Sequence, residues 1–110
     1  MVCTVLGGGV SGLSTGIRLL ERGLEVHLVA EKMSPETVSD TAAAWWYPFL
    51  VEPLIKTNRW SSESFREFVR LMDEVGLEFI TMRMGREYLK RPGRAPGWSE
   101  SIDHFRILEE

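Results

Sequence analysis

A chain of 110 residues, 44% of them hydrophobic and 26% charged, has the composition of one globular domain or part of one, which excludes disordered and collagen-like chains. The formal net charge of −3 argues against a nucleic-acid partner and against a polybasic membrane patch. The single cysteine, Cys3, excludes an internal disulfide, and with two distant histidines it leaves no metal site to predict.

No targeting or membrane segment is expected. Glycines begin at Gly7, so the N-terminus lacks the long apolar run of a secretory signal. No apolar stretch reaches the ~20 residues of a membrane-spanning helix. We therefore expect a cytoplasmic location, with Cys3 as a small buried residue in an apolar strand.

The beginning of the chain has the pattern of a strand, a helix and a second strand. Val2–Leu6 is short and apolar, which is typical of a parallel strand buried on both faces. Residues 10–22 carry apolar side chains at helical spacing, and Gly23 is placed to end that helix. Residues 25–30 form the second apolar run. Together they predict a β-α-β unit with a parallel sheet.

A glycine motif, G-x-G-x-x-G, joins the first strand to the helix. Gly7 permits the tight turn, Gly9 lets a pyrophosphate approach the backbone, and Gly12 allows close packing of helix and strand. Val10 and Ser11 then offer the amides and positive dipole end of the helix N-terminus to phosphates. The motif in this context predicts a dinucleotide site.

An acidic residue, Glu31, follows the second strand 19 residues after Gly12. A carboxylate at this place accepts hydrogen bonds from ribose hydroxyls and disfavours the 2′-phosphate of NADP. The alternative is a glycine-rich turn with an incidental acidic residue at a strand end. The strand and helix on either side of the motif favour the dinucleotide.

The next segment bears on which dinucleotide binds. Thr37, Ser39 and Thr41 are followed by alanines, where an NAD-binding half usually continues into another helix and strand. The hydroxyls are suited to phosphate or ribitol oxygens, and Ala43 and Ala44 would let a flat ring lie against the backbone. A capped short helix whose alanines merely pack is the alternative. The spacing favours FAD.

The second half of the chain predicts a helix and short strands. The helix is expected to begin at Trp60, with Ser61 or Ser62 as its cap, and to end at Gly76.

Beyond this helix, residues 77–80 and 82–89 are expected to be two short strands, turning at Gly85. Residues 102–108 fit a strand or a helix equally well.

Short strings along nearly the whole chain are similar to one known family. They are Gly7-Gly8-Gly9-Val10-Ser11-Gly12-Leu13-Ser14-Thr15, Val29-Ala30-Glu31-Lys32, Pro35, Thr37, Ser39-Asp40, Ala42-Ala43, Trp46, Pro48, Trp60-Ser61, Phe65, Pro96-Gly97-Trp98 and Phe105-Arg106. In this order they resemble the N-terminal part of the D-amino-acid oxidase family of FAD-dependent oxidoreductases.

The resemblance implies an α/β fold with a Rossmann-like FAD-binding β-α-β unit. It also implies a reaction in which a D-amino acid gives its α-hydrogen as hydride to the flavin. The imino acid then hydrolyses to a 2-oxo acid and ammonia, and dioxygen reoxidises the flavin to yield hydrogen peroxide. The flavin performs the difficult step, and the protein supplies orientation and electrostatics.

The resemblance assigns cofactor contacts by position. Glu31 and Lys32 match the acidic-basic pair at the adenosine ribose and a nearby phosphate, while Thr37 and Ser39 match phosphate-side contacts. The full set of predicted cofactor-binding residues is Gly7, Gly9, Val10, Ser11, Gly12, Glu31, Lys32, Thr37, Ser39, Ala43, Ala44 and Trp45.

The sequence departs from the family pattern in two single residues and one short segment. Glu31 replaces the aspartate common in animal members, and Val38 stands where a threonine is common. Residues 45–49 replace Leu-Trp-Gln-Pro-Tyr, whose glutamine and tyrosine line the active site. Tyr47 and Phe49 are therefore the substrate-side candidates, either in contact with substrate or as aromatic packing beneath the flavin.

Members of this family are longer than the present chain, and the resemblance places their catalytic residues in the later part. We therefore expect residues 1–110 to be the N-terminal part of an FAD-binding domain, with 1–50 forming the β-α-β unit and flavin-side loop. Residues 51–110 would lead towards a substrate domain. The open sheet edges predict a homo-oligomer or a missing C-terminal part.

Two other functions stay open at this point: an NAD-binding dehydrogenase half, and a non-catalytic nucleotide-binding or interaction module.

Overall fold

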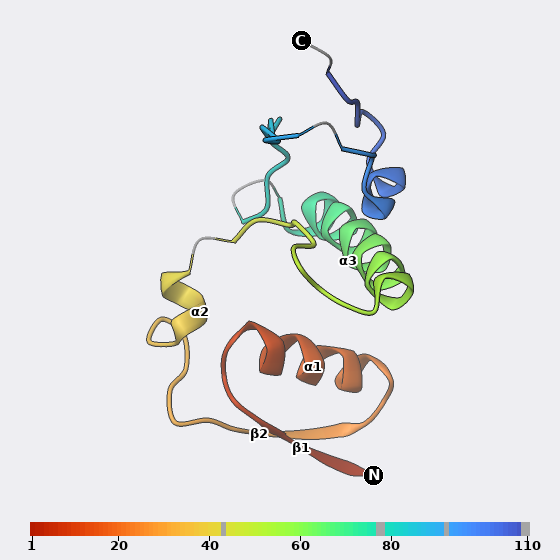
Figure 1. The fold of residues 1–110 in the computed structure, drawn as a ribbon. Helices are drawn as coiled ribbons and strands as arrows, with labels where there is room; N and C mark the ends of the chain where they lie inside the picture. Colours follow the sequence, from red (N-terminus) through yellow and green to blue (C-terminus); the bar gives the residue numbers. More distant parts are fainter. Residues whose placement is uncertain (43, 77–78, 92, 109–110) are drawn as a thin grey trace. The chain divides into compact units, whose positions relative to one another are not determined.

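The computed structural model describes residues 1–42, 44–76, 79–91 and 93–108, in two compact units, Met1–Trp45 and Trp46–Glu110 (Figure 1). The first unit contains β1 (Val2–Leu6), α1 (Val10–Glu21), β2 (Glu25–Val29) and α2 (Val38–Thr41). The second contains α3 (Leu54–Val75) and the 3₁₀ helix η1 (Gly97–Ser101). Among the described residues, none of the helices is both long and apolar enough to cross a membrane.

The first unit is built on the predicted β-α-β arrangement. β1 and β2 pair in parallel, with Val2 opposite Glu25 and Leu6 opposite Val29, and α1 packs against both strands (Figure 1). Val5 is buried in this unit. The α/β fold with a parallel two-stranded sheet is thus confirmed. The N-terminus of α1 follows the carboxyl end of β1 after a turn of three glycines.

The strands are less buried than predicted. Leu6 and Val29, opposite each other in the register, are 77% and 56% exposed, and Cys3 is only partly buried. A strand buried on both faces needs cover on both faces. Within this unit α1 covers one face only, so the expected burial of β1 on both faces is wrong for this chain.

The C-terminus of α1 follows the local sequence signal. Gly23 has a φ of 76°, a conformation that glycine adopts without strain. Its amide donates to the Leu20 carbonyl at 2.8 Å, and the Leu24 amide donates to the Leu19 carbonyl at 3.1 Å. These two bonds form a Schellman motif, as the placement of Gly23 predicts.

The helix α3 begins earlier than predicted. Pro53, not Ser61 or Ser62, is its N-cap residue, and Ser61 lies inside the helix with 8% of its surface exposed. The serines serve close packing instead of capping: the Ser62 hydroxyl contacts the Ser101 hydroxyl of η1. The predicted end is correct, since α3 closes at Gly76 with a φ of 94°.

The predicted hairpin after α3 is wrong where the structure describes it. Residues 79–91 contain no strand, and residues 77 and 78 lie outside the described part. Residues 102–108 are neither strand nor helix. A strand is stable only when it pairs, and the apolar alternation of 82–89 has no partner strand in the described part of this unit.

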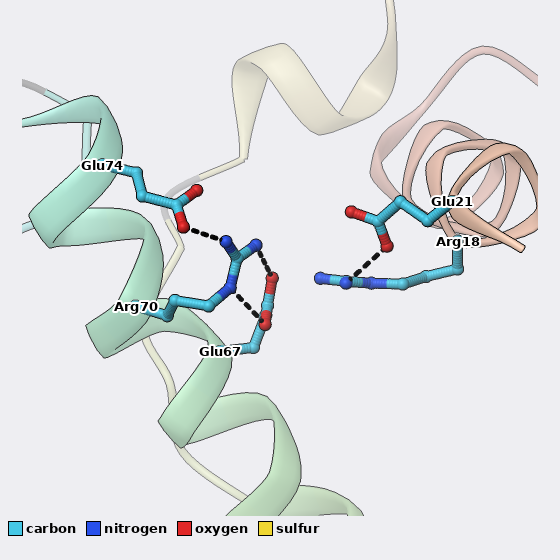
Figure 2. A network of polar contacts seen from close by, with 5 residues as sticks. All are labelled: Arg18, Glu21, Glu67, Arg70 and Glu74. Carbon is cyan, nitrogen blue, oxygen red and sulfur yellow. Dashed lines mark hydrogen bonds and ion pairs between the residues drawn. The ribbon is translucent and has the colours of Figure 1, made fainter.

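Ion pairs occur on one helix of each unit (Figure 2). On α1, Arg18 Nη1 lies 2.7 Å from Glu21 Oε2. On α3, Arg70 contacts both Glu67, at 2.6 Å, and Glu74 (Figure 2). These pairs are exposed to solvent, so they support their own helices and contribute little to the fold.

Candidate dinucleotide site

The turn between β1 and α1 requires glycine at its first position. Gly7 has a φ of 110°, a backbone conformation that residues other than glycine rarely adopt. Its amide donates to the Val29 carbonyl at 2.8 Å, which extends the β1–β2 ladder by one bond. The chain then turns directly into α1 at Val10.

Gly12 permits the closest approach in this turn. A Cβ atom built on Gly12 would lie 2.0 Å from the Gly7 carbonyl oxygen and 3.6 Å from Val5 Cγ1. The first contact is with the backbone, so no side-chain rotation could relieve it. This is the close helix–strand packing for which the motif places a glycine here.

Gly9 is the N-cap residue of α1, and the hydroxyl of Ser39 lies in front of it. A Cβ atom on Gly9 would lie 2.9 Å from Ser39 Oγ. The same hydroxyl oxygen accepts a hydrogen bond from the Val10 amide at 3.1 Å. The first amide of α1 therefore already donates to an oxygen atom, at the place where a phosphate oxygen is expected.

Gly8 matters although the motif leaves its position open. A Cβ atom there would lie 2.6 Å from the Lys32 carbonyl oxygen and 2.7 Å from Met33 Sδ. Gly8 therefore lets the segment after β2 pass next to the glycine turn. The run of three consecutive glycines is the sequence signal for this close approach, although the motif itself requires only two of them.

We expect Gly8→Ala to destabilise the chain by about 1–3 kcal/mol, because the Lys32 carbonyl must move. The measurement is denaturant unfolding. The double variant Gly8→Ala/Met33→Ala is the control: it removes the sulfur contact and keeps the backbone contact, so the loss should persist. A full recovery in the double variant would contradict the backbone explanation.

The segment before α2 is organised around the carboxylate of Asp40. Asp40 Oδ2 accepts from the Thr37 amide at 2.9 Å and from the Thr37 hydroxyl, and Oδ1 accepts from the Ser34 hydroxyl at 2.7 Å. The short α2 with Thr37 as its N-cap residue matches the capped helix considered as an alternative for this segment. It still presents the Ser39 hydroxyl to α1.

These hydrogen bonds, those from Thr37 first and then that from Ser34, hold the pKa of the Asp40 carboxyl below its ordinary value of 3.8. A lowered pKa in the folded chain means that the bonds stabilise the loop above pH 3.8 and are lost as the pH falls through the lowered value. We therefore expect the Thr37 amide signal in NMR spectra to shift only below pH 3.8. A shift centred above that value would contradict this arrangement.

A pocket of about 270 Å³ lies between the start of α1 and the α2 segment. It brings together four of the predicted cofactor residues, Gly9, Val10, Thr37 and Ser39, and its full lining is Gly8, Gly9, Val10, Leu13, Ser14, Ile17, Ser34, Thr37, Ser39 and Asp40. Hydroxyl groups and a helix N-terminus are the donors that suit phosphate. The binding of a dinucleotide pyrophosphate in this pocket stays a prediction.

The other predicted cofactor residues lie outside this lining. Glu31 and Lys32 are exposed just after β2, and the Lys32 carbonyl lies near Gly8. Trp45 is 68% exposed. Ala44 is exposed too, and Ala43 lies outside the described residues. For these positions the cofactor role stays a prediction.

The two substrate-side candidates belong to the second unit. The rings of Tyr47 and Phe49 stack with centroids 6.1 Å apart, and Tyr47 meets Trp98 edge-on at 5.5 Å. The Tyr47 hydroxyl donates to Glu87 Oε1 at 2.7 Å, and this bond raises the pKa of Tyr47. Both rings therefore have an aromatic packing role, while contact with a substrate stays a prediction.

Trp98 is the centre of this aromatic cluster. Its ring also meets Trp46 at 5.8 Å and Phe105 at 5.6 Å, both nearly perpendicular. Trp46 in turn packs on Phe65 of α3 and donates its indole N–H to the Ser64 hydroxyl at 3.1 Å. Since these residues come from four separated segments, the cluster holds the second unit together.

Comparison with known proteins decides the family. The model of the FAD dependent oxidoreductase family, DAO, matches residues 3–108. The chain belongs to this family. Its glycine turn lies between β1 and α1, inside the β-α-β unit.

Relatives of this DAO-family chain include three curated D-amino-acid oxidases. The protein of Rubrobacter xylanophilus is 37% identical over 96% of this chain and 32% of its own length. That of Dictyostelium discoideum is 33% identical over 93% of this chain and 30% of its own length, and that of Streptomyces coelicolor is 33% identical over 74% and 25%. The chain spans about a third of the length of the curated relatives it matches. No solved structure matches it significantly.

Proposed function

We propose that this chain forms the dinucleotide-binding part of an FAD-dependent D-amino-acid oxidase. The whole enzyme would convert a D-amino acid to a 2-oxo acid, ammonia and hydrogen peroxide, with dioxygen as the second substrate. The observation that carries the proposal is the Val10 amide at the start of α1, which donates to a hydroxyl oxygen at the edge of a pocket in a chain of this family. The names of the relatives support the choice of D-amino acids.

In this proposal the chain's own residues bind and orient the cofactor. Gly9 leaves room for the Ser39 hydroxyl, and the positive end of α1 attracts the pyrophosphate, with the Val10 amide acting on it through that hydroxyl. The Ser39 hydroxyl adds a donor from the α2 segment, while the Thr37 hydroxyl, which donates to Asp40, can only accept. Glu31 would accept from the adenosine ribose, and Lys32 would neutralise phosphate charge. Bound FAD would accept the hydride that the substrate loses.

A titration of the whole polypeptide with FAD, followed by flavin fluorescence, tests the binding step. We expect Glu31→Gln to weaken FAD binding about tenfold or more, because a hydrogen bond to a charged acceptor is lost. Glu36→Gln is the matched control, since it makes the same charge change in the neighbouring loop. Binding of NAD⁺ in place of FAD would favour a dehydrogenase half and contradict the proposal.

The reaction itself is tested by a hydrogen peroxide assay on the whole polypeptide. The proposal expects peroxide from D-amino acids and none from their L-enantiomers, and it expects the protein in the cytoplasm. FAD binding without peroxide from any D-amino acid would support an FAD-binding module and contradict the oxidase function.

A further inference from the structure

Asp40 holds together a loop that contains three of the four hydroxyl side chains of the pocket, those of Ser34, Thr37 and Ser39. Its carboxylate accepts from Ser34 and from the amide and hydroxyl of Thr37. Ser39 directly precedes Asp40 in α2, and its hydroxyl reaches 29 residues back in the sequence to accept from the Val10 amide. The position of Ser39 thus depends on the loop that Asp40 closes.

The Ser39 hydroxyl can serve two partners at once. A serine hydroxyl has one proton to donate and two lone pairs to accept with. Because its oxygen accepts from the Val10 amide, its proton remains to donate to an oxygen atom in the pocket. The Val10 amide polarises this hydroxyl group, so the hydroxyl proton extends the positive potential of the α1 N-terminus into the pocket.

A carboxylate that lines a phosphate pocket needs an explanation, because the two charges repel each other. Asp40 lines the pocket, yet both of its oxygens accept hydrogen bonds from its own loop. These bonds occupy the carboxylate with a structural task. They also keep the carboxylate ionised, so that it remains an acceptor for these donors.

We propose that Asp40 is a positioning residue of the dinucleotide site, which places the Ser39 hydroxyl between the Val10 amide and a phosphate oxygen of the cofactor. The identity of the ligand rests on the proposed function. The contact from Asp40 through Ser39 to Val10 does not, and it can be tested in the absence of any cofactor.

Amide hydrogen exchange in the cofactor-free chain is the first test. Asp40→Ala should accelerate exchange at Val10 and Thr37 about tenfold, as expected for the loss of one hydrogen bond. Asp40→Asn keeps one accepting oxygen and should restore part of the protection. Glu36→Ala, whose carboxylate makes no hydrogen bond or ion pair among the described residues, should leave Val10 exchange unchanged.

A double-variant comparison separates positioning from a general loss of stability. If Asp40 acts through Ser39, then Asp40→Ala should change Val10 exchange no further once Ser39→Ala is present. Exchange at Gly23, whose amide bonds the Leu20 carbonyl at the other end of α1, should stay constant in every variant. Independent, additive effects at Val10, or an unchanged Val10 in Asp40→Ala, would overturn the proposal.

An FAD titration of the same variants completes the test. Asp40→Ala and Ser39→Ala should each weaken FAD binding about tenfold, and the double variant no more than the stronger single one. If Val10 exchange responds but the whole polypeptide binds no FAD, the positioning contact stands and the proposed function fails. If FAD binds with equal affinity to all variants, the positioning role is wrong and the proposed function stands.

Discussion

Gly12→Ala is expected to abolish measurable FAD binding and to destabilise the first unit by at least about 3 kcal/mol. The added Cβ atom would lie 2.0 Å from the Gly7 carbonyl oxygen. Ordinary van der Waals contact requires more than 3 Å, so α1 or the glycine turn must move by about 1 Å. Either movement changes the helix start at which the phosphates are expected. Denaturant unfolding and a flavin fluorescence titration measure the two effects.

Gly16→Ala is the matched control in the same helix. A Cβ atom on Gly16 would lie 3.7 Å from Val26 Cγ1, which is an ordinary contact. Because alanine favours the helix over glycine, we expect a gain of about 0.5–1 kcal/mol and unchanged FAD binding. Equal stability of the Gly12→Ala and Gly16→Ala chains would refute the close packing described at Gly12.

Trp98→Ala is expected to destabilise the second unit by about 2–4 kcal/mol. The substitution removes three edge-on ring contacts, with Trp46, Tyr47 and Phe105. Among the described residues, no other ring of the cluster makes as many ring contacts. Unfolding in denaturant should report the loss, and the NMR signals of the Tyr47 ring should lose the shift that a neighbouring indole causes.

Trp60→Ala controls for the loss of a large side chain. Trp60 lies on α3 and is 55% exposed, so Trp60→Ala should lower the free energy of unfolding much less than Trp98→Ala does. Trp98→Phe keeps an aromatic ring in place and should recover part of the stability. A similar loss from Trp60→Ala and Trp98→Ala would mean that the aromatic cluster does not stabilise this unit.

The candidate site was predictable where it depends on contacts within a few residues. The glycine motif predicted the turn at Gly7 and the close approach at Gly12 because both act on the adjoining backbone. Gly8 was missed because its neighbour, Lys32, is distant in the sequence. The function of Asp40 had a visible signal, a threonine three residues before an acidic residue at a helix start, which is typical of a cap.

The boundaries of α3 show the limit of local signals. Gly76 ends the helix as predicted, since a glycine C-cap acts on its own turn. Its beginning was missed because Ser61 and Ser62 were interpreted as caps, whereas Ser61 is buried and Ser62 contacts Ser101. A serine suits a cap and a close helix contact equally, and only the packing partner distinguishes the two.

The sequence alone therefore determined the β-α-β order, the parallel pairing of β1 and β2, and the glycine turn, because strand periodicity, helix ends and tight turns depend on neighbouring residues. Only the tertiary structure decided that the Ser39 hydroxyl accepts from the Val10 amide and that Trp98 is the centre of the aromatic cluster. It also decided that residues 82–89 form no strand. Each of these depends on a partner far away in the chain, and the identity of such a partner is set by packing.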